Sequence, residues 1–127
     1  MRVLILFTHA PIVKPEVTLE SREIGAVVEF WGIVREQEGE QYLAGLAYEA
    51  YLPMAHTQMQ RIFEELSRDH PCDAVEFIHR LGPVPVNEPS LWIRVQSRHR
   101  AEALCLLSES VRRMKIDVPI WKASLPS

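Results

Sequence analysis

One stretch near the middle of the chain predicts a helix that can be buried on only one side. Pro53 suits the first turn of a helix, where its missing N–H costs nothing. Behind it, apolar residues recur at positions i, i+4, i+7, i+8 and i+11, which is the spacing of a single helical stripe. These residues are Ala55, Met59, Ile62, Phe63 and Leu66. Such a helix needs a second layer to cover its apolar face, and a sheet is the layer expected here.

Short apolar segments on both sides of this helix predict strands. Residues 24–34 are β-branched and aromatic with two internal glycines, which predicts a long central strand with a bend or bulge. The polar turn 36–41 and the alternating segment 43–51 then predict a hairpin, with Leu46, Tyr48 and Ala50 on one face. Further strands are expected over residues 2–8, 73–81, 91–97 and 119–123, with a short helical or irregular connection at 16–23 and a Pro-rich loop at 82–89.

A second helix is expected over residues 100–115. Its apolar positions Leu104, Leu107, Val111 and Met114 keep helical spacing, and Asp117 and Pro119 end it. The chain of 127 residues, 47% of them hydrophobic, is long enough for one ordinary core and shows no internal repeat. We therefore expect residues 1–127 to form a single α+β domain, in which two helices cover a mixed or antiparallel sheet.

Charge is unevenly distributed along the chain. The whole sequence has a net charge of −3, but residues 94–122 contain seven Lys and Arg against three Asp and Glu. A basic segment on an acidic body indicates a local site for a small anion, because a protein that coats nucleic acid usually carries a broader positive face. For Arg94, Arg112 and Arg113, each taken singly, the interpretation as a solvated surface residue is favoured.

The cysteines and the amino terminus point to the cytoplasm. Cys72 and Cys105 lack the spacing of a disulfide framework or a zinc site, so two reduced thiols are expected. The apolar run at the amino terminus is much shorter than a signal sequence or a membrane span.

Arg98, His99 and Arg100 stand where a predicted strand meets the second helix. Free backbone N–H groups and the helix dipole favour anions at such a junction, and these side chains add further donors. A phosphate site and an ordinary solvent-exposed boundary are equal alternatives on pattern alone. His79 alternates with apolar neighbours along a strand, which favours a hydrogen-bonded, half-buried histidine.

Three other cations stand at the ends of elements. Arg35 ends the most hydrophobic strand, at a place where loops can gather around a ligand. Lys115 closes the second helix, where a cation also complements the helix dipole. Lys122 follows Trp121 in an apolar segment, so its ammonium must reach solvent, find a counter-ion or take part in proton transfer. Taken alone, Arg35 is weak evidence for a site, the helix dipole already justifies a lysine at 115, and contact with solvent is the commoner outcome for a lysine such as Lys122.

Several enzyme classes are excluded because their residue sets are missing. The chain has no GxSxG, Walker, HExxH or GxGxxG motif. Ser108 and Ser110 have no evident base. A Cys105 nucleophile lacks a well-placed partner, so an inert thiol is expected there.

The order of several short motifs resembles the large-subunit family of molybdopterin synthase over nearly the whole chain. Of the two most specific motifs, one opens the second helix and the other lies near the carboxyl end. The matching segments are GAVVEFWGIVR (25–35), YEAYLPM (48–54), HRLG (79–82), SRHR (97–100) and KIDVPIWK (115–122).

This resemblance implies an α/β-hammerhead-like fold and a sulfur-transfer activity. Sulfur would move from the thiocarboxylated C-terminal glycine of a small ubiquitin-like carrier subunit onto cyclic pyranopterin monophosphate, which forms the molybdopterin dithiolene. Two sulfurs are needed, so two carriers would act in turn. The resemblance further implies a homodimer that holds one carrier tail in each copy, hence a heterotetramer, with no metal and no organic cofactor.

The resemblance also implies roles for five residues. Lys115 would lie at the carrier's terminal thiocarboxylate, and Lys122 near the pterin, where it assists proton transfer and stabilises developing negative charge. Arg35, with His99 and Arg100 from the neighbouring subunit, would hold the phosphate and the pterin. Lys115 and Lys122 are therefore the expected catalytic residues.

The chain departs from the family pattern mainly at its end. The usual Trp-Lys-Lys-Glu and a longer tail become WKASLPS (121–127), so the second basic residue and the acid are absent. Leu104 stands where the family has Phe, Arg112 where it has Asp, and Asn87 where it has Gly. The last change is mild, because Asn tolerates left-handed backbone.

Two other functions compete with sulfur transfer. The altered tail motivates a non-catalytic relative that binds the carrier or the pterin as a scaffold. A nucleic-acid-binding module is disfavoured by the acidic pI and by the lack of a row of exposed stacking aromatics.

Overall fold

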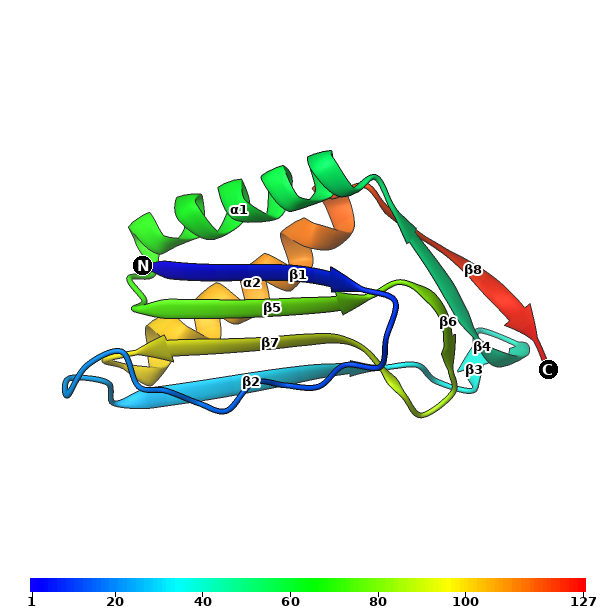
Figure 1. The fold of residues 1–127 in the computed structure, drawn as a ribbon, viewed down its shortest axis with the longest axis horizontal. Helices are drawn as coiled ribbons and strands as arrows, with labels where there is room; N and C mark the ends of the chain where they lie inside the picture. Colours follow the sequence, from blue (N-terminus) through cyan, green and yellow to red (C-terminus); the bar gives the residue numbers. More distant parts are fainter.

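The chain folds into two β-sheets and two α-helices in a computed structural model that describes residues 1–127 (Figure 1). Along the chain the strands are β1 (Arg2–Thr8), β2 (Ala26–Ile33), β3 (Gln37–Glu38), β4 (Gln41–Ala50), β5 (Ala74–Arg80), β6 (Gly82–Pro85), β7 (Pro89–Ser97) and β8 (Ile120–Pro126). The helices are α1 (Leu52–Asp69) and α2 (Arg100–Asp117). The expected α+β class, with a mixed sheet and two main helices, is confirmed.

The larger sheet has the strand order β1-β5-β7-β2. β1 lies parallel to β5, and the other two pairings are antiparallel. The prediction that residues 24–34 form a central strand is wrong, because β2 lies at the edge while β5 and β7 occupy the centre. The apolar composition of β2 suggested a strand that is covered on both faces. Val27, Trp31 and Ile33 on one face of β2 are instead exposed. The predicted bulge is present between Gly32 and Ile33.

The smaller sheet is built around β4, which pairs with β3, β6 and β8. The predicted hairpin between residues 24–34 and 43–51 is wrong, because the polar turn joins only the short β3 to β4 while β2 belongs to the larger sheet. The predicted Pro-rich loop at 82–89 contains a strand, β6, which runs so close to β4 that a side chain at Gly45 would collide with Val84 O. This sheet stands beside one end of the larger one, at the right of Figure 1.

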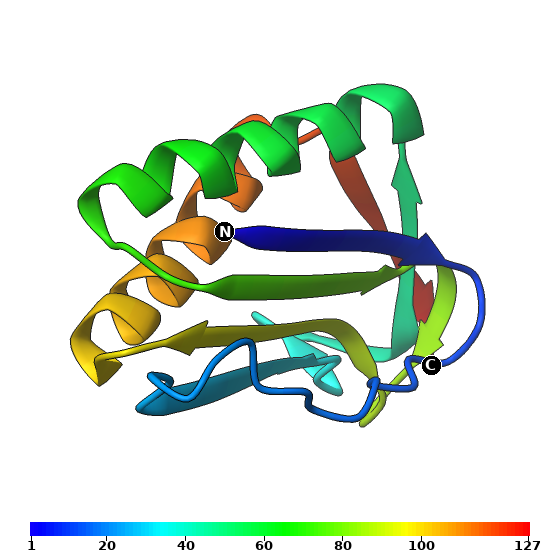
Figure 2. The same cartoon turned by 60° about the vertical axis from the view of Figure 1, so that its left-hand side comes forward.

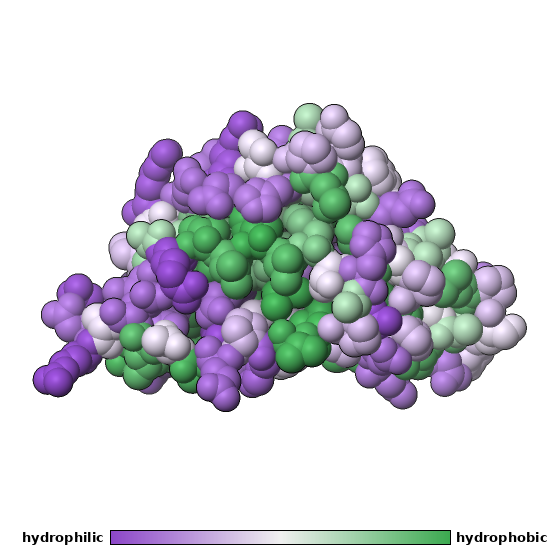
Figure 3. Space-filling view, viewed as in Figure 1, coloured by the Kyte–Doolittle hydropathy of each residue, from purple (hydrophilic) through white to green (hydrophobic).

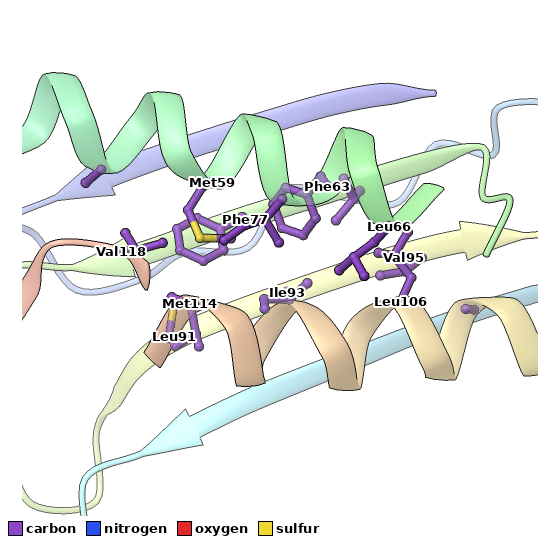
Figure 4. Packing of buried hydrophobic residues seen from close by; sticks show 14 residues of the cluster. Met59, Phe63, Leu66, Phe77, Leu91, Ile93, Val95, Leu106, Met114 and Val118 are labelled. Carbon is purple, nitrogen blue, oxygen red and sulfur yellow. The ribbon is translucent and has the colours of Figure 1, made fainter. Parts of the chain in front are cut away.

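The main core lies between the larger sheet and the two helices (Figure 4). All five residues of the predicted α1 stripe are buried in it, from Ala55 to Leu66. The predicted inward residues of β7, which are Leu91, Ile93 and Val95, are buried there too and pack beside Phe77 of β5. The spacing of the apolar residues in α1 and their alternation in β7 therefore agree with the packing. Neither helix combines the length and hydrophobicity that crossing a membrane requires.

Of the apolar stripe predicted for α2, Met114 lies in the core and Leu107 and Val111 pack against it, so the prediction is wrong only at Leu104. The positions that α2 buries are Ala103, Leu106, Ser110 and Met114. Leu104, by contrast, is 53% exposed, and Leu107 and Val111 are only half-buried. The prediction favoured large apolar residues, whereas the close packing of α2 on the sheet uses a small alanine and a serine at two of its four contact positions. Leu104, Leu107 and Val111 lie along a second, more open flank of α2.

The irregular segment between β1 and β2 covers part of the sheet face that is turned away from α2 (Figure 2). The Gln96 side chain donates a hydrogen bond to Thr18 O at 2.8 Å, and Arg94 Nη2 donates to Glu16 O at 3.3 Å. Of the two alternatives predicted for residues 16–23, the irregular one is therefore present. Hydrophobic side chains gather in the middle of the face shown in Figure 3, and Leu4 and Leu6 of β1 are exposed.

Candidate active site

A cavity of about 700 Å³ lies where the two sheets meet the C-terminal end of α2. Eleven of its 18 lining residues are hydrophobic, and three of the others are cations. The walls are formed by residues 30–33 of β2, Leu46 and Tyr48 of β4, His79 of β5, Val111 and Met114 of α2, and residues 120–122 of β8. Apolar walls with a few charged groups are the usual form of a site for a small organic molecule.

Arg35, Lys115 and Lys122 all line this cavity, although 87 positions separate the first from the last. Lys122 Nζ donates a hydrogen bond to Glu38 Oε1 at 3.3 Å, and Glu38 is the only acidic residue of the lining. Neither Arg35 nor Lys115 forms a side-chain hydrogen bond or an ion pair. The cavity therefore carries an excess of positive charge, which favours an anionic ligand.

Each of the three cations is placed by its own element. Arg35 directly follows Val34, whose buried backbone is held by hydrogen bonds to Asn87 N and Glu88 O. Lys115 directly follows the buried Met114 in the last turn of α2, so it lies next to the face of the helix that packs on the core. Lys122 lies directly opposite Tyr48 in the antiparallel pair of β8 and β4. Three separate parts of the fold thus bring these charges to one place.

His99 and Arg100 do not line the cavity of their own chain. They stand at the N-terminal end of α2, and Lys115 stands near its C-terminal end. The 15 positions between Arg100 and Lys115 correspond to about 22 Å along the helix axis. Neither residue forms a side-chain hydrogen bond or an ion pair. Within one chain, the structure therefore brings together three of the five predicted site residues and leaves the other two apart.

The flank of α2 that borders the cavity connects these two ends. Arg100, Leu104, Leu107, Val111 and Lys115 follow the pattern i, i+4, i+7, i+11 and i+15, which places them along one side of the helix. Val111 and Lys115 meet residues of β2 at the cavity. The opposite flank faces α1, because Arg113 pairs with Glu65 at 2.8 Å. The flank of α2 near β2 is thus a partly exposed apolar strip with a cation at each end.

The other basic residues of segment 94–122 are paired with acids away from the cavity. Arg94 is 2% exposed and pairs with the buried Glu76 at 2.9 Å, so its interpretation as a solvated residue is wrong. Arg112 pairs with Glu109, and Arg98 pairs with Glu23. The positive charge of this segment is therefore spread over several faces of the protein instead of forming one anion site.

His79 and Tyr48 were not singled out as site residues, yet both line the cavity. His79 is 3% exposed, and its Nδ1 lies 2.8 Å from Arg80 O. Because a carbonyl oxygen only accepts, Nδ1 carries the proton and Nε2 is left as an acceptor. Burial lowers the pKa of His79 to about 4, so the ring is neutral at pH 7. The Tyr48 ring packs edge-on against it, with 5.0 Å between the ring centroids.

These residues were missed because their placement depends on strand pairing. His79 was correctly expected to be hydrogen-bonded, but it is more deeply buried than the alternation suggested. Tyr48 reaches the cavity only because β4 pairs with β8, and Glu38 reaches it only because β3 folds back onto β4. The aromatic residues in YEAYLPM were the only available signal, and they did not indicate a cavity.

The two cysteines lie outside the cavity, and both are free thiols. Burial raises the pKa of the Cys72 thiol to about 11, which keeps it protonated and unreactive at neutral pH. Cys105 is exposed on α2. No group of three or more His, Cys, Asp and Glu residues is arranged to hold a metal ion.

The chain is similar in sequence to one known protein family. The family described as "MoaE protein" matches residues 7–117. The human protein named molybdopterin synthase catalytic subunit is 39% identical over 101 residues, which are 80% of this chain and 54% of that protein. Its namesake from Staphylococcus aureus strain Mu50 is 34% identical over 120 residues, 90% of this chain and 81% of that protein. The chain thus spans about half the length of its mammalian relatives.

Solved structures share the fold. The crystal structure of molybdopterin synthase from Staphylococcus aureus has a TM-score of 0.79 at 34% identity and covers 84% of this chain and 78% of that one. A structure described as a protein–protein complex of subunits 1 and 2 of molybdopterin-converting factor from Helicobacter pylori 26695 has a TM-score of 0.69 at 21% identity. It covers 96% of this chain and 83% of that one.

Proposed function

The chain belongs to the MoaE family, and we propose that it is the catalytic subunit of a molybdopterin synthase. It transfers sulfur from the thiocarboxylated C-terminal glycine of a small ubiquitin-like carrier to cyclic pyranopterin monophosphate, which forms the molybdopterin dithiolene. Residues 1–127 act as one domain in this reaction. Two relatives with this name are 34% and 39% identical to the chain, and the cavity offers a site of suitable charge and volume.

The observation that carries the proposal is the meeting of Arg35, Lys115 and Lys122 in one largely apolar cavity. Both reactants are anions, since the carrier ends in a thiocarboxylate and the pterin carries a cyclic phosphate. Arg35, Lys115 and Lys122 are exposed in the single chain, and a carrier tail that displaces water from the cavity would strengthen the attraction between these anions and the cations. An excess of fixed positive charge is therefore what this reaction needs.

The two lysines take different parts in the reaction. Lys115, which has no protein partner, binds the carrier's thiocarboxylate and holds its sulfur toward the pterin. Lys122 lies beside the pterin, where its ammonium assists proton transfer and stabilises the negative charge that develops. Arg35 at the cavity wall binds the phosphate, for which its planar guanidinium is well suited.

His99 and Arg100 reach the site from a second copy of the chain in a homodimer. Two features support this arrangement: β2 is an edge strand, and the adjacent flank of α2 exposes Leu104. If two copies meet along this flank with their α2 helices antiparallel, the Arg100 end of one helix lies beside the Lys115 end of the other. Each cavity then gains the donors that its own chain cannot supply.

The carrier subunit and the cellular compartment follow from the same function. A protein of this fold is described as a complex of two subunits. Here a carrier inserts its tail into each cavity of the homodimer, so the assembly is a heterotetramer, and two carriers act in turn to supply two sulfurs. The chain itself uses no metal and no organic cofactor. Its two free thiols suit a reducing compartment, which we take to be the cytoplasm.

Reconstitution with purified components tests this function. The chain is mixed with a thiocarboxylated carrier and cyclic pyranopterin monophosphate, and molybdopterin is measured after its conversion to a fluorescent derivative. We expect molybdopterin to form, and we expect none with a carrier that ends in an ordinary carboxylate. Binding of both reactants without any product would show that the chain is a scaffold, and would contradict the proposal.

A further inference from the structure

Lys122 is the only cation of the cavity that has a carboxylate partner. Its Nζ lies 3.3 Å from Glu38 Oε1, and 84 positions separate the two residues in the sequence. Glu38 also lines the cavity, whereas Arg35 and Lys115 have no acidic neighbour within ion-pair distance. The contact therefore joins the proposed proton-transfer residue to a hairpin that the proposed mechanism does not otherwise use.

The hairpin of β3 and β4 is built to present Glu38. Gly39 adopts a φ of +61°, which lets the chain turn sharply between Glu38 and Gln41. The base of the hairpin is closed by the backbone hydrogen bond from Leu43 N to Glu36 O at 2.7 Å. Glu36 and Glu40 lie on the same hairpin, but they are exposed and form no ion pair. Among these three acids, only Glu38 is directed toward the cavity.

The contact contributes little to the stability of the fold. The two side chains are 33% and 56% exposed, and ion pairs at this level of exposure are weakened by water and salt. Its effect is local, because a lysine side chain has several freely rotating bonds and one carboxylate restricts where its ammonium lies. The same carboxylate also offsets part of the positive charge that attracts an anion into the cavity.

We propose that Glu38 is a positioning residue: its carboxylate holds the Lys122 ammonium at the cavity and, in doing so, weakens the binding of the anionic pterin. This inference rests on the proposed function, because it assigns Lys122 to the reaction. Glu38 itself does not touch the reacting atoms. Glu38 thus orients the Lys122 ammonium and at the same time lowers the affinity of the cavity for the pterin.

A kinetic comparison of Glu38→Gln with the wild type tests both effects, on the orientation of Lys122 and on the binding of the pterin. Loss of the carboxylate is expected to lower KM for the cyclic pterin about twofold to fivefold and to lower kcat by a similar factor, which is the range of an exposed ion pair. Glu40→Gln, which removes a charge from the same hairpin without touching Lys122, should leave both constants unchanged. If Glu38 only supported the hairpin, Glu38→Gln would lower kcat with an unchanged or higher KM and would lower the melting temperature.

A second measurement is independent of turnover. The chain has only three lysines, at positions 14, 115 and 122, so an amine-acylating reagent followed by mass spectrometry reports each of them separately. Lys122 is expected to react about twofold to fivefold faster, relative to Lys14, in Glu38→Gln than in the wild type. Glu38→Asp, which keeps the charge on a shorter side chain, should lie between the two.

The two measurements separate the possible failures. An unchanged Lys122 acylation rate in Glu38→Gln, or a KM that does not fall, overturns the role of Glu38. If the wild type forms no molybdopterin but Lys122 still reacts faster in Glu38→Gln, the contact holds Lys122 as inferred and the proposed function is wrong.

Discussion

The imidazole of His79 is buried beside the cavity without an acidic partner. Burial lowers its pKa from 6.5 to about 4 in the folded protein, so the unfolded chain binds a proton at a pH where the folded chain does not. The free energy of unfolding should therefore fall as the pH decreases from 6.5 to about 4, and this group should contribute about 3 kcal/mol to the fall. Urea unfolding across this pH range measures it.

A variant without the His79 imidazole isolates this contribution. His79→Phe keeps an aromatic ring between Phe77 and Tyr48 but cannot bind a proton, so its stability should depend less steeply on pH than that of the wild type. His56→Gln, which removes an exposed imidazole of α1, should keep the wild-type dependence. Equal slopes for His79→Phe and the wild type would contradict the assignment of a neutral, buried imidazole.

Arg35, Lys115 and Lys122 could be named from the sequence only because the motifs that contain them resemble those of a known family. All three line the cavity. Glu38 and Tyr48 could not be predicted in this way, because they reach the cavity through pairings of β3, β4 and β8. Local pattern gives no information on which distant strands pair.

The turn between β6 and β7 holds the backbone next to Arg35. Asn87 has a φ of 71°, and its N–H donates to Val34 O at 2.8 Å. Asn87→Ala should lower the free energy of unfolding by about 1 kcal/mol, because alanine is strained at positive φ, whereas Asn87→Gly should be neutral or slightly stabilising. Thermal unfolding of the two variants provides the measurement. Equal stability of the alanine and glycine variants would contradict the left-handed turn.

At the scale of elements, the prediction succeeded where one face of an element decides its packing. α1 follows its apolar stripe, and β7 follows its alternation. It failed for β2, which was expected at the centre of the sheet, and in part for α2, where Leu104 is exposed. Both failures concern apolar residues that the single chain leaves partly exposed. The second copy of the proposed homodimer would cover β2 and the Leu104 flank of α2, which accounts for apolar residues there.

At the scale of the whole molecule, a second chain completes each cavity of the proposed homodimer. Arg100→Ala and Lys115→Ala should each inactivate a homodimer. When the two variants are mixed and allowed to exchange subunits, half of the dimers pair one copy of each, and one of the two cavities in such a dimer is intact. The mixture should therefore recover about a quarter of the wild-type molybdopterin formation.

Subunit exchange has its own controls. Leu104→Glu places a charge on the flank of α2 and should yield a monomer in light scattering. When both the Arg100→Ala chain and the Lys115→Ala chain also carry Leu104→Glu, their mixture should recover no activity. If the unmodified mixture recovers no activity although mass spectrometry shows mixed dimers, Arg100 does not act in the neighbouring cavity.

In the proposed function, Lys115 and Lys122 perform sulfur transfer in the cavity between the two sheets and α2. Molybdopterin formation is therefore compared in Lys115→Ala, Lys122→Ala and Lys14→Ala, which remove the only three lysines of the chain one at a time. Lys14 lies outside the cavity and pairs with Glu29 at 3.2 Å. We expect the first two variants to lose about 100-fold or more of the wild-type rate while staying folded, and Lys14→Ala to keep it. Wild-type rates in both Lys115→Ala and Lys122→Ala would contradict these roles of the two lysines.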